Sequence, residues 1–262
     1  MTGEAGAGAR RGVLVVVGTP IGNLGDLSPR AVRTLAGADL VVCEDTRRAR
    51  KLLSAAGVSA PPLLAANDHT ETAQIGTVLA RLEGGATVAV ISDAGLPGIS
   101  DPGERMVRAA AAEGFDVQVV PGPSAALSAL VVSGLATGRF VFEGFLPRKG
   151  QGRSERLTAL AGEERTAVLY EAPHRLARTL AELCTAVGGE RRVALCRELT
   201  KLYEETWRGT LAAAVRRHDD IEPRGEYVVV LEGAAPAPSV ADATLIAALS
   251  LLVGEGASTR DA

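Results

Sequence analysis

The amino-acid sequence predicts an α/β protein of two domains, on three observations. Short, continuously apolar runs alternate with helical patterns through the first half of the chain. A small-residue segment at 133–139 follows, and the apolar runs beyond it are longer. The chain has 262 residues, more than one core of ordinary size requires. Together these features favour one α/β domain on each side of a hinge at 133–139.

The first domain is expected at residues 12–135. Apolar residues from Ile75 to Leu82 recur at the spacing of one helix face, and Ser28 before Pro29 is typical of a helix start. Continuous apolar runs suit parallel strands that are buried on both faces. Four such runs predict strands: VLVVV (13–17), LVVC (40–43), TVAVI (87–91) and VQVV (117–120). Strands that alternate with helices predict a parallel sheet covered by helices.

The second domain is expected at residues 139–234, with a mixed sheet. Pro173 is suited to open a helix, and the close spacing of VALCREL and YEETWRG predicts a hairpin. The predicted strands are FVFEGF, TAVLYEA, RVALCREL, LYEETWRG and EYVVVLEG. Residues 1–11 are expected to form a flexible tail, and residues 235–262 a linker followed by a helical segment.

Composition excludes several classes of protein. A net charge of -3 gives no general attraction to nucleic acid or to anionic membranes. Cys43, Cys184 and Cys196 are too scattered for a disulfide framework or a zinc cluster, which predicts reduced thiols and a cytoplasmic protein without a metal site. No apolar run is long enough to span a bilayer, and the run at 13–17 is too short for a signal peptide.

The loops after the predicted strands of the first domain carry unusual residues. They read GTPIGNLGDLSPRA, EDTRRARK, SDAGLPGISDPG and PGPSAAL. In open α/β sheets, ligands bind beyond the carboxyl ends of the strands, where glycines allow close approach of the backbone. Neither the dinucleotide-binding glycine pattern nor the P-loop pattern is present. These loops predict a small-molecule site of another kind, although tight turns alone also favour Gly and Pro.

Seven motifs, in order, carry a resemblance to a known family. They are VGTPIGNLGDLSPRA, CEDTRR, ISDAGLPGISDPG, VVPGPSA, FEGFLPRKGQGR, YEAPHR and RELTKLYEE. Over residues 13–233 the chain resembles the tetrapyrrole-methylase-like superfamily of class III methyltransferases. Within it, the chain resembles the branch that methylates cytidine 2′-hydroxyls of 16S rRNA.

The resemblance implies two α/β domains with a cofactor cleft between them, S-adenosylmethionine as the cofactor, and a homodimer. It also implies a substrate: a cytidine ribose in the decoding region of 16S rRNA, within the small ribosomal subunit. No membrane partner is expected. Matched motif by motif, the expected cofactor-binding residues are Pro20, Ser92, Asp93, Ala94, Pro97, Ile99, Ser124, Ala125, Tyr170, Glu171, Leu199, Gly225 and Glu226. The 235–262 segment is shorter than the corresponding region of such relatives, so it is expected to be truncated.

A ribose hydroxyl is a poor acid, so a nearby base or anion-stabilising group would assist methyl transfer. The catalytic candidates are Glu44, Asp45, Asp101, Glu198 and Lys201, with Glu171 and His174 considered beside them. Each also has a structural interpretation: Asp45 can cap a helix, and Asp101 before Pro102 can stabilise a turn. The sequence leaves the choice open.

Two arginine-rich segments are candidates for contact with RNA phosphates, namely RRARK (47–51) and RKGQGRSER (148–156). The second contains Gly150 and Gly152 and is expected to be a flexible basic loop. The expected RNA-binding residues are Arg47, Arg48, Arg148, Lys149, Arg153 and Arg156.

Three other functions remain open at this point. A tetrapyrrole macrocycle is the alternative substrate within the superfamily. A non-catalytic protein that binds S-adenosylmethionine and assists ribosome assembly is the second alternative. A metal-dependent aldolase or hydrolase that uses Glu44, Asp45 and Asp93 is the third.

Overall fold

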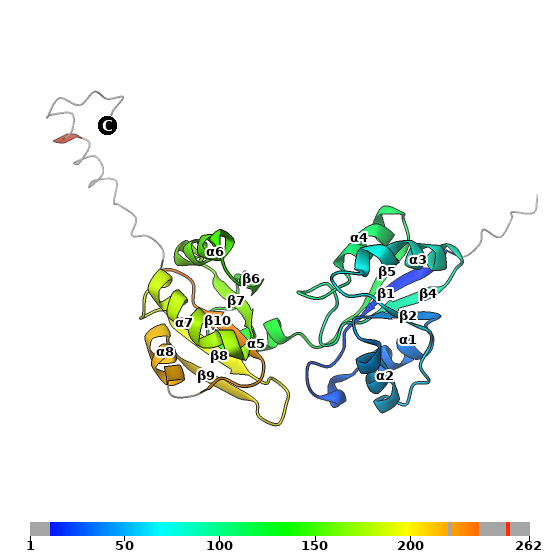
Figure 1. The fold of residues 1–262 in the computed structure, drawn as a ribbon, viewed down its shortest axis with the longest axis horizontal. Helices are drawn as coiled ribbons and strands as arrows, with labels where there is room; N and C mark the ends of the chain where they lie inside the picture. Colours follow the sequence, from blue (N-terminus) through cyan, green and yellow to red (C-terminus); the bar gives the residue numbers. More distant parts are fainter. Residues whose placement is uncertain (1–10, 220–221, 236–249, 252–262) are drawn as a thin grey trace, which may run out of the picture.

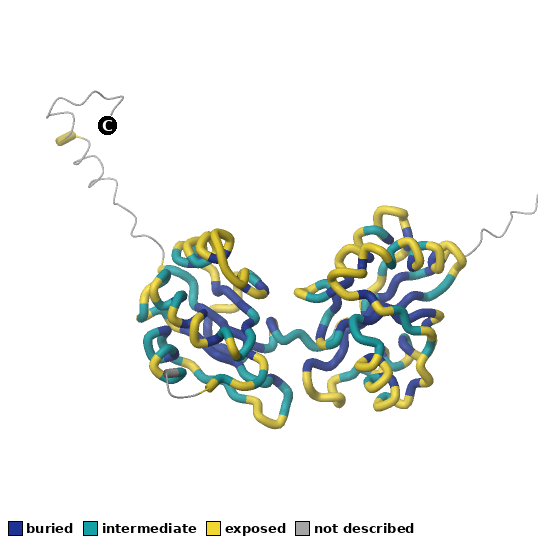
Figure 2. The backbone as a smooth tube through the Cα atoms, viewed as in Figure 1, coloured by how far each residue is buried: buried dark blue, intermediate teal, exposed yellow. Residues whose placement is uncertain are grey.

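The structure, a computed structural model, describes residues 11–219, 222–235, 250 and 251. The expected tail at 1–11 and the expected helical segment within 235–262 lie almost wholly outside the described residues. The described chain forms two α/β domains side by side, joined through the segment before α5 (Figure 1). Buried strands run through the middle of each domain, with exposed helices and loops around them (Figure 2).

The first domain contains a five-stranded, wholly parallel sheet in the order β3-β2-β4-β1-β5. Its strands are β1 (Val13–Val17), β2 (Leu40–Cys43), β3 (Leu63–Ala65), β4 (Thr87–Val90) and β5 (Asp116–Val120). The four predicted strands are confirmed. The short edge strand β3 was not predicted, because three residues beside two prolines give too weak a pattern. Central β1 and β4 place their carboxyl ends, and the loops that follow them, at one edge of the sheet.

Helices cover both faces of this sheet. They are α1 (Pro29–Ala36), α2 (Thr46–Ala55), α3 (Glu71–Glu83) and α4 (Glu104–Ala112), with a 3₁₀ turn η1 (Leu24–Asp26) after β1. Leu35 and Leu53 are buried in the core on the α1 and α2 side, and Leu82 and Met106 in the core on the α3 and α4 side. The predicted start of α1 is confirmed, since the Ser28 side chain accepts a hydrogen bond from the Ala31 N–H at 3.1 Å.

A buried carboxylate holds the start of α4. The residue before this helix is Gly103, which has no side chain to cap it. Glu71 of α3 is only 3% exposed and accepts hydrogen bonds from the backbone N–H groups of Gly103, Arg105 and Met106 at 3.0 to 3.1 Å. One carboxylate therefore satisfies three helix-terminal donors and anchors the end of the loop at residues 92–103.

The second domain contains a mixed sheet in the order β6-β7-β10-β8-β9. Its strands are β6 (Phe140–Phe145), β7 (Thr166–Glu171), β8 (Arg192–Arg197), β9 (Glu205–Thr210) and β10 (Tyr227–Leu231). Only β6 and β7 pair in parallel; the predicted β8–β9 hairpin is confirmed. Helices α6 (Gln151–Gly162), α7 (Pro173–Val187) and α8 (Leu211–Asp219) pack around one core with this sheet, and α7 begins at Pro173 as predicted.

The domain boundary lies earlier than the sequence suggested. Helix α5 (Ala125–Ser133) packs Ala129 and Leu130 against Val230 and other residues of the second sheet. The chain therefore crosses between domains at 121–124, and the expected boundary at 135 is wrong. Gly134 does not form a hinge: it ends α5 in the left-handed conformation, with φ 74°. None of the helices in the described part of the chain is long and apolar enough to cross a bilayer.

Candidate active site

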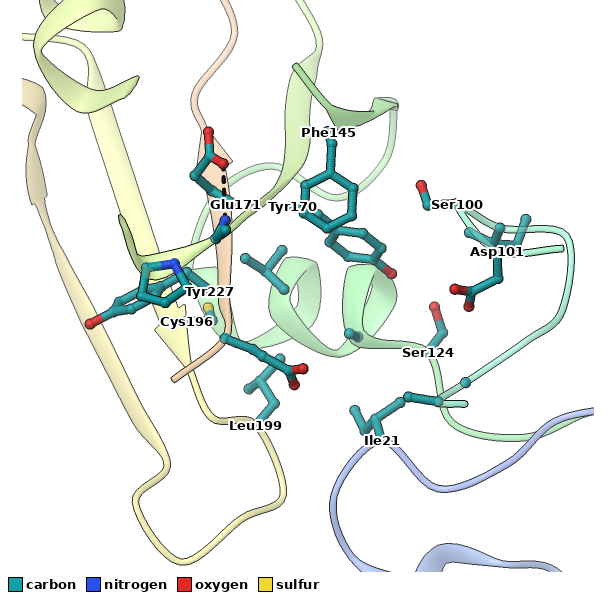
Figure 3. Close-up of a pocket in the computed structure, with 18 of the residues that line it drawn as sticks. Ile21, Ser100, Asp101, Ser124, Phe145, Tyr170, Glu171, Cys196, Leu199 and Tyr227 are labelled. Atoms are coloured by element: carbon teal, nitrogen blue, oxygen red, sulfur yellow. Dashed lines mark hydrogen bonds between the residues drawn. The ribbon is translucent and has the colours of Figure 1, made fainter. Parts of the chain in front are cut away.

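A cavity of about 440 Å³, here called the cleft cavity, lies between the two domains (Figure 3). The first domain contributes the loops after β1 and β4 and the segment that leads into α5. The second contributes the ends of β6 and β7, the start of α7 and the turn after β8. Of the expected cofactor-binding residues, those that line it are Ala94, Ile99, Ser124, Ala125, Tyr170, Glu171, Leu199 and Glu226.

Close backbone contacts join the first-domain loops into one wall. The Thr19 hydroxyl donates to the carbonyl oxygens of Ser92 and Gly95, each at 3.3 Å, and the Thr19 N–H donates to the Gly95 carbonyl. Gly18 and Gly122 touch so closely that a Cβ on Gly18 would lie 2.7 Å from the Gly122 Cα. The glycines of these motifs therefore allow the loops after β1, β4 and β5 to pack together.

The second-domain wall is largely apolar and aromatic. Tyr170 contacts Phe142 and Phe145 edge to face, with ring centroids 5.1 and 5.5 Å apart. Figure 3 shows the Tyr170 hydroxyl pointing toward Ser124 and Asp101. Burial raises the pKa of Tyr170, so the hydroxyl stays protonated and is available as a donor.

The side chain of Asp101, one of the catalytic candidates, faces the cleft cavity. Burial, with a further contribution from the charge of Glu44, raises its pKa to about 6. A carboxyl group of this kind is ionised at neutral pH yet basic enough to accept a proton. Asp101 can therefore act as a base in this cavity.

Lys201 lies at the opposite side of the cleft in a network of charges. Its ammonium donates to Glu198 Oε1 at 2.9 Å and to Glu226 Oε2 at 2.6 Å. Burial opposes the charge on Lys201, but these hydrogen bonds outweigh it and raise the pKa of the ammonium. Lys201 lines the cleft cavity as a stable cation, able to stabilise an anion but unsuited to accept a proton.

Glu198 and Gly225 support this network from outside the cavity. Burial favours the neutral form of Glu198, but hydrogen bonds from Lys201 and the Glu226 N–H prevail and lower its pKa. Gly225 has φ 81°, and a Cβ there would lie 2.6 Å from the Glu198 carboxyl carbon. Glu198 and Gly225 line neither this cavity nor the one described next, and Glu198 contacts both Lys201 and the Glu226 backbone.

A second cavity of about 440 Å³, here called the side cavity, adjoins the first. The two share Ile21, Ala94, Lys201 and Glu226. Three residues expected to bind the cofactor line only the side cavity: Pro20, Ser92 and Asp93. Pro97 lines neither cavity and packs against Gly103 instead. The expected cofactor-binding set therefore divides between two chambers.

Glu44 and Asp45 follow β2 but line neither cavity. Asp45 caps α2 by accepting from the Arg47 N–H at 2.7 Å, and it pairs with the Arg47 guanidinium at 2.9 Å. These hydrogen bonds lower the pKa of Asp45 to about 2. Burial and the charge of Asp93 raise the pKa of Glu44. The structure supports the capping interpretation of Asp45 and places Asp101 and Lys201 at the cleft.

The expected flexible basic loop at 148–156 is wrong from Gln151 onward, because α6 begins there. Arg153 is 3% exposed, and its guanidinium donates to Glu182 at 2.7 Å, to Thr179 at 2.9 Å and to the Pro147 carbonyl at 3.0 Å. Arg153 therefore cannot reach a phosphate while the domain is folded. Arg148 and Lys149 are exposed.

Several residues that line the cleft cavity were not predicted, among them Ile21, Ser100 and Phe145. Ile21 and Ser100 lie inside recognised motifs but carry no chemical signal of their own. Phe145 ends a predicted strand and is 52% exposed, and only the packing of the two domains places it at the cleft. Among the described residues, no cluster of three or more His, Cys, Asp or Glu side chains is arranged to hold a metal ion.

Sequence comparison decides the family. The pattern of the tetrapyrrole (corrin/porphyrin) methylases matches residues 13–215. The ribosomal RNA small subunit methyltransferase I of Synechocystis sp. is 46% identical over 253 residues, which cover 96% of this chain and 90% of that protein. The chain belongs to the ribosomal RNA small subunit methyltransferase I family, within the tetrapyrrole methylases. The Thermotoga maritima member is 45% identical over 222 residues, which cover 85% of this chain and 99% of that protein.

Solved structures confirm the fold class. A diphthine synthase has a TM-score of 0.65 at 13% identity, covering 84% of this chain and 89% of its own. A uroporphyrin-III C-methyltransferase from Thermus thermophilus, complexed with S-adenosyl homocysteine, has a TM-score of 0.59 at 20% identity and covers 84% and 97%. This member of the ribosomal RNA small subunit methyltransferase I family is an S-adenosylmethionine-dependent methyltransferase, which confirms the predicted cofactor.

Proposed function

We propose that this protein transfers the methyl group of S-adenosylmethionine to the 2′-hydroxyl of a cytidine in the decoding region of 16S rRNA. The substrate is the assembled small ribosomal subunit. The relatives named ribosomal RNA small subunit methyltransferase I support an rRNA substrate. The observation that carries the proposal is the cleft cavity, where Asp101, a carboxyl group with a pKa of about 6, lies at the edge of a largely apolar chamber.

The cleft cavity fits the cofactor. Its volume of about 440 Å³ lies in the range of small-molecule pockets. Ile21, Leu199 and Val228 offer an apolar surface for the adenine ring. Ser124 and Ala125 begin α5, and N–H groups at the start of a helix attract a carboxylate. When bound, S-adenosylmethionine supplies an electrophilic methyl group on a positively charged sulfur.

The chain's own residues prepare the acceptor oxygen. Asp101 accepts the proton of the 2′-hydroxyl, since its carboxylate is basic for an aspartate and lies on the cavity. Tyr170 donates a hydrogen bond from the opposite wall, and the Lys201 ammonium offsets negative charge on the oxygen. Holding both reactants in one closed geometry supplies much of the remaining barrier reduction.

Exposed basic residues make local contacts with rRNA phosphates. Those proposed are Arg47, Arg148, Lys149 and Arg156, whereas Arg48, expected with them, pairs with Asp93 in the side cavity. Because the net charge is -3, docking depends on such local patches and on the shape of the subunit. The protein acts in the cytoplasm as a homodimer. Val119, Leu127 and Val131 are large apolar side chains exposed on β5 and α5, and they supply contact surface for a second copy.

Methyl-labelled S-adenosylmethionine tests the proposal with small subunits from cells that lack their own 2′-O-methylase, and with naked 16S rRNA in parallel. The expected result is label on one cytidine ribose of the subunit, in a linkage that resists alkaline hydrolysis. Asp101→Asn is expected to bind the cofactor and transfer little label. Label on a tetrapyrrole but not on RNA would support the macrocycle alternative. Cofactor binding without transfer to any acceptor would support a non-catalytic assembly factor.

A further inference from the structure

The side cavity contains an ion pair without a role in the chemistry described above. Arg48 of α2 and Asp93, after β4, both line this cavity, and the guanidinium lies 3.1 Å from the Asp93 carboxylate. The Asp93 side chain is 20% exposed, whereas that of Arg48 is 70% exposed. A carboxylate has about four acceptor sites, more than its ion pair uses, and an exposed guanidinium retains further donors. The pair can therefore bind a ligand that carries a hydrogen-bond donor, for Asp93, next to a hydrogen-bond acceptor, for Arg48.

We propose that the side cavity receives the cytosine base of the target nucleotide and that Asp93 and Arg48 read its Watson–Crick edge. The inference rests on the proposed function and adds how the site selects its base. Cytosine presents an amino donor at N4 beside acceptors at N3 and O2. Asp93 accepts from N4, and Arg48 donates to N3 and O2. Uracil has an acceptor at position 4 and a donor at N3, so it opposes both residues.

The position of the side cavity suits a base whose ribose is to be methylated. It shares Lys201 and Glu226 with the cleft cavity, so a base in the side cavity leaves its ribose at the boundary, next to the cofactor chamber. The boundary is narrow at Gly22, where a Cβ would lie 2.4 Å from the Lys201 side chain. A volume of about 440 Å³ accommodates a nucleotide turned out of its stack.

This placement revises what the family motif implied for Asp93. The residue was expected to bind the cofactor, yet it lines the side cavity and not the cleft cavity. Three cations line that cavity, Arg48, Lys51 and Lys201, and the exposed Lys51 is available for the nucleotide's phosphate. We therefore place Asp93 with the nucleotide that receives the methyl group and not with the cofactor.

Asp93→Asn tests the proposal, because it keeps the size of the side chain but adds an amide donor that suits O4 of uracil. Methyl transfer is compared between subunits with cytidine and with uridine at the methylated position. We expect the wild-type protein to favour cytidine about tenfold or more, and Asp93→Asn to lose most of that preference. Its dissociation constant for S-adenosylmethionine is expected to stay within about twofold of the wild-type value.

Arg48→Ala and Arg47→Ala form a matched pair, since both remove one exposed arginine from the start of α2 and only Arg48 lines the side cavity. Arg48→Ala should reduce the cytidine preference, and Arg47→Ala should leave that ratio unchanged. The inference is overturned if both Asp93→Asn and Arg48→Ala keep the wild-type ratio of cytidine to uridine methylation. It is also overturned if Asp93→Asn keeps this ratio but binds S-adenosylmethionine more weakly. Absence of methyl transfer by the wild-type protein to either nucleotide would instead contradict the proposed function.

Discussion

The two arginine-rich segments have similar compositions, but the structure gives them opposite surroundings. In the segment at 148–156, Arg153 is buried and its guanidinium is bonded to Glu182, Thr179 and a backbone carbonyl. In the segment at 47–51, Arg48 is mostly exposed and shares a cavity with Asp93. The difference shows that a charge is available to a ligand only where the fold leaves part of its hydrogen-bonding capacity unused.

The largest effect on stability is expected for the buried arginine, Arg153. Arg153→Ala should lower the free energy of unfolding by about 4 kcal/mol, because it leaves buried partners without their donor. Arg156→Ala, three residues later in α6, removes an arginine that is 52% exposed and should cost less than about 1 kcal/mol. Denaturant unfolding of both variants measures the contrast. Equal losses would mean that burial does not distinguish the two arginines.

Glutamates show the same difference between a buried and an exposed side chain, with Glu71 buried and Glu83 exposed. Glu71→Ala should lower the free energy of unfolding by about 3 kcal/mol, because three backbone N–H groups at the start of α4 lose their acceptor. It should also weaken cofactor binding, since the loop at 92–103 loses its anchor. Glu83→Ala, at the exposed end of α3, is the control. A Glu71 variant with wild-type stability in thermal denaturation would show that the hydrogen bonds contribute little.

Asp101 shows how partial burial changes a charge that faces the cleft. With a pKa of about 6, it is ionised at neutral pH, so the methylation rate should fall about tenfold per pH unit below pH 6. Asp101→Asn should be slow at every pH and remove this limb of the profile, whereas Glu104→Gln should keep it. A wild-type rate that is flat from about pH 5 to 8 would exclude Asp101 as the base.

The raised pKa of Asp101 also makes the stability of the protein depend on pH. The folded pKa of Asp101 lies above the ordinary value of 3.8, so the protonated form favours folding. The stabilising contribution is complete below pH 3.8 and is lost as the pH rises through about 6. Asp101→Asn should therefore stabilise the protein at pH 8 relative to the wild type.

The smallest expected effect concerns the exposed part of the second arginine-rich segment. Replacing both Arg148 and Lys149 by Ala should weaken subunit binding a few-fold and reduce the slope of log affinity against log salt concentration by about 1 to 2. Arg33→Ala, an exposed arginine of α1, is the control and should leave the slope unchanged. A salt titration of subunit binding measures both. An unchanged slope in the double variant would remove these residues from the RNA surface.

Regular elements with a periodic pattern could be predicted from the sequence. The continuous runs from Val13 to Val17 and from Leu40 to Cys43 give strands within a residue of those observed, and Ser28 and Pro29 mark the start of α1. The domain boundary could not be predicted, because α5 is apolar all round and its pattern does not say which sheet it packs against. Only the contacts of Leu130 with the second sheet decide that.

The loops that form the candidate site could be predicted from the sequence, but the cavity that each residue lines could not. Asp101, Ser124 and Tyr170 line one cavity, and the family resemblance had implied a shared cofactor site for Ser124 and Tyr170. Long-range contacts decide the rest: Asp93 meets Arg48, and Arg153 is buried against α7. Sequence spacing does not record such contacts, so residues of one motif end in different chambers or inside a core.

We expect cofactor and target nucleotide to occupy two adjoining cavities. A crystal structure of the protein with S-adenosylhomocysteine would locate the cofactor. The ligand should lie in the cleft cavity, against Ser124, Tyr170 and Leu199, and should not touch the intact Arg48–Asp93 ion pair. A ligand bound through the Asp93 carboxylate in the side cavity would show that the two cavities do not divide cofactor from nucleotide.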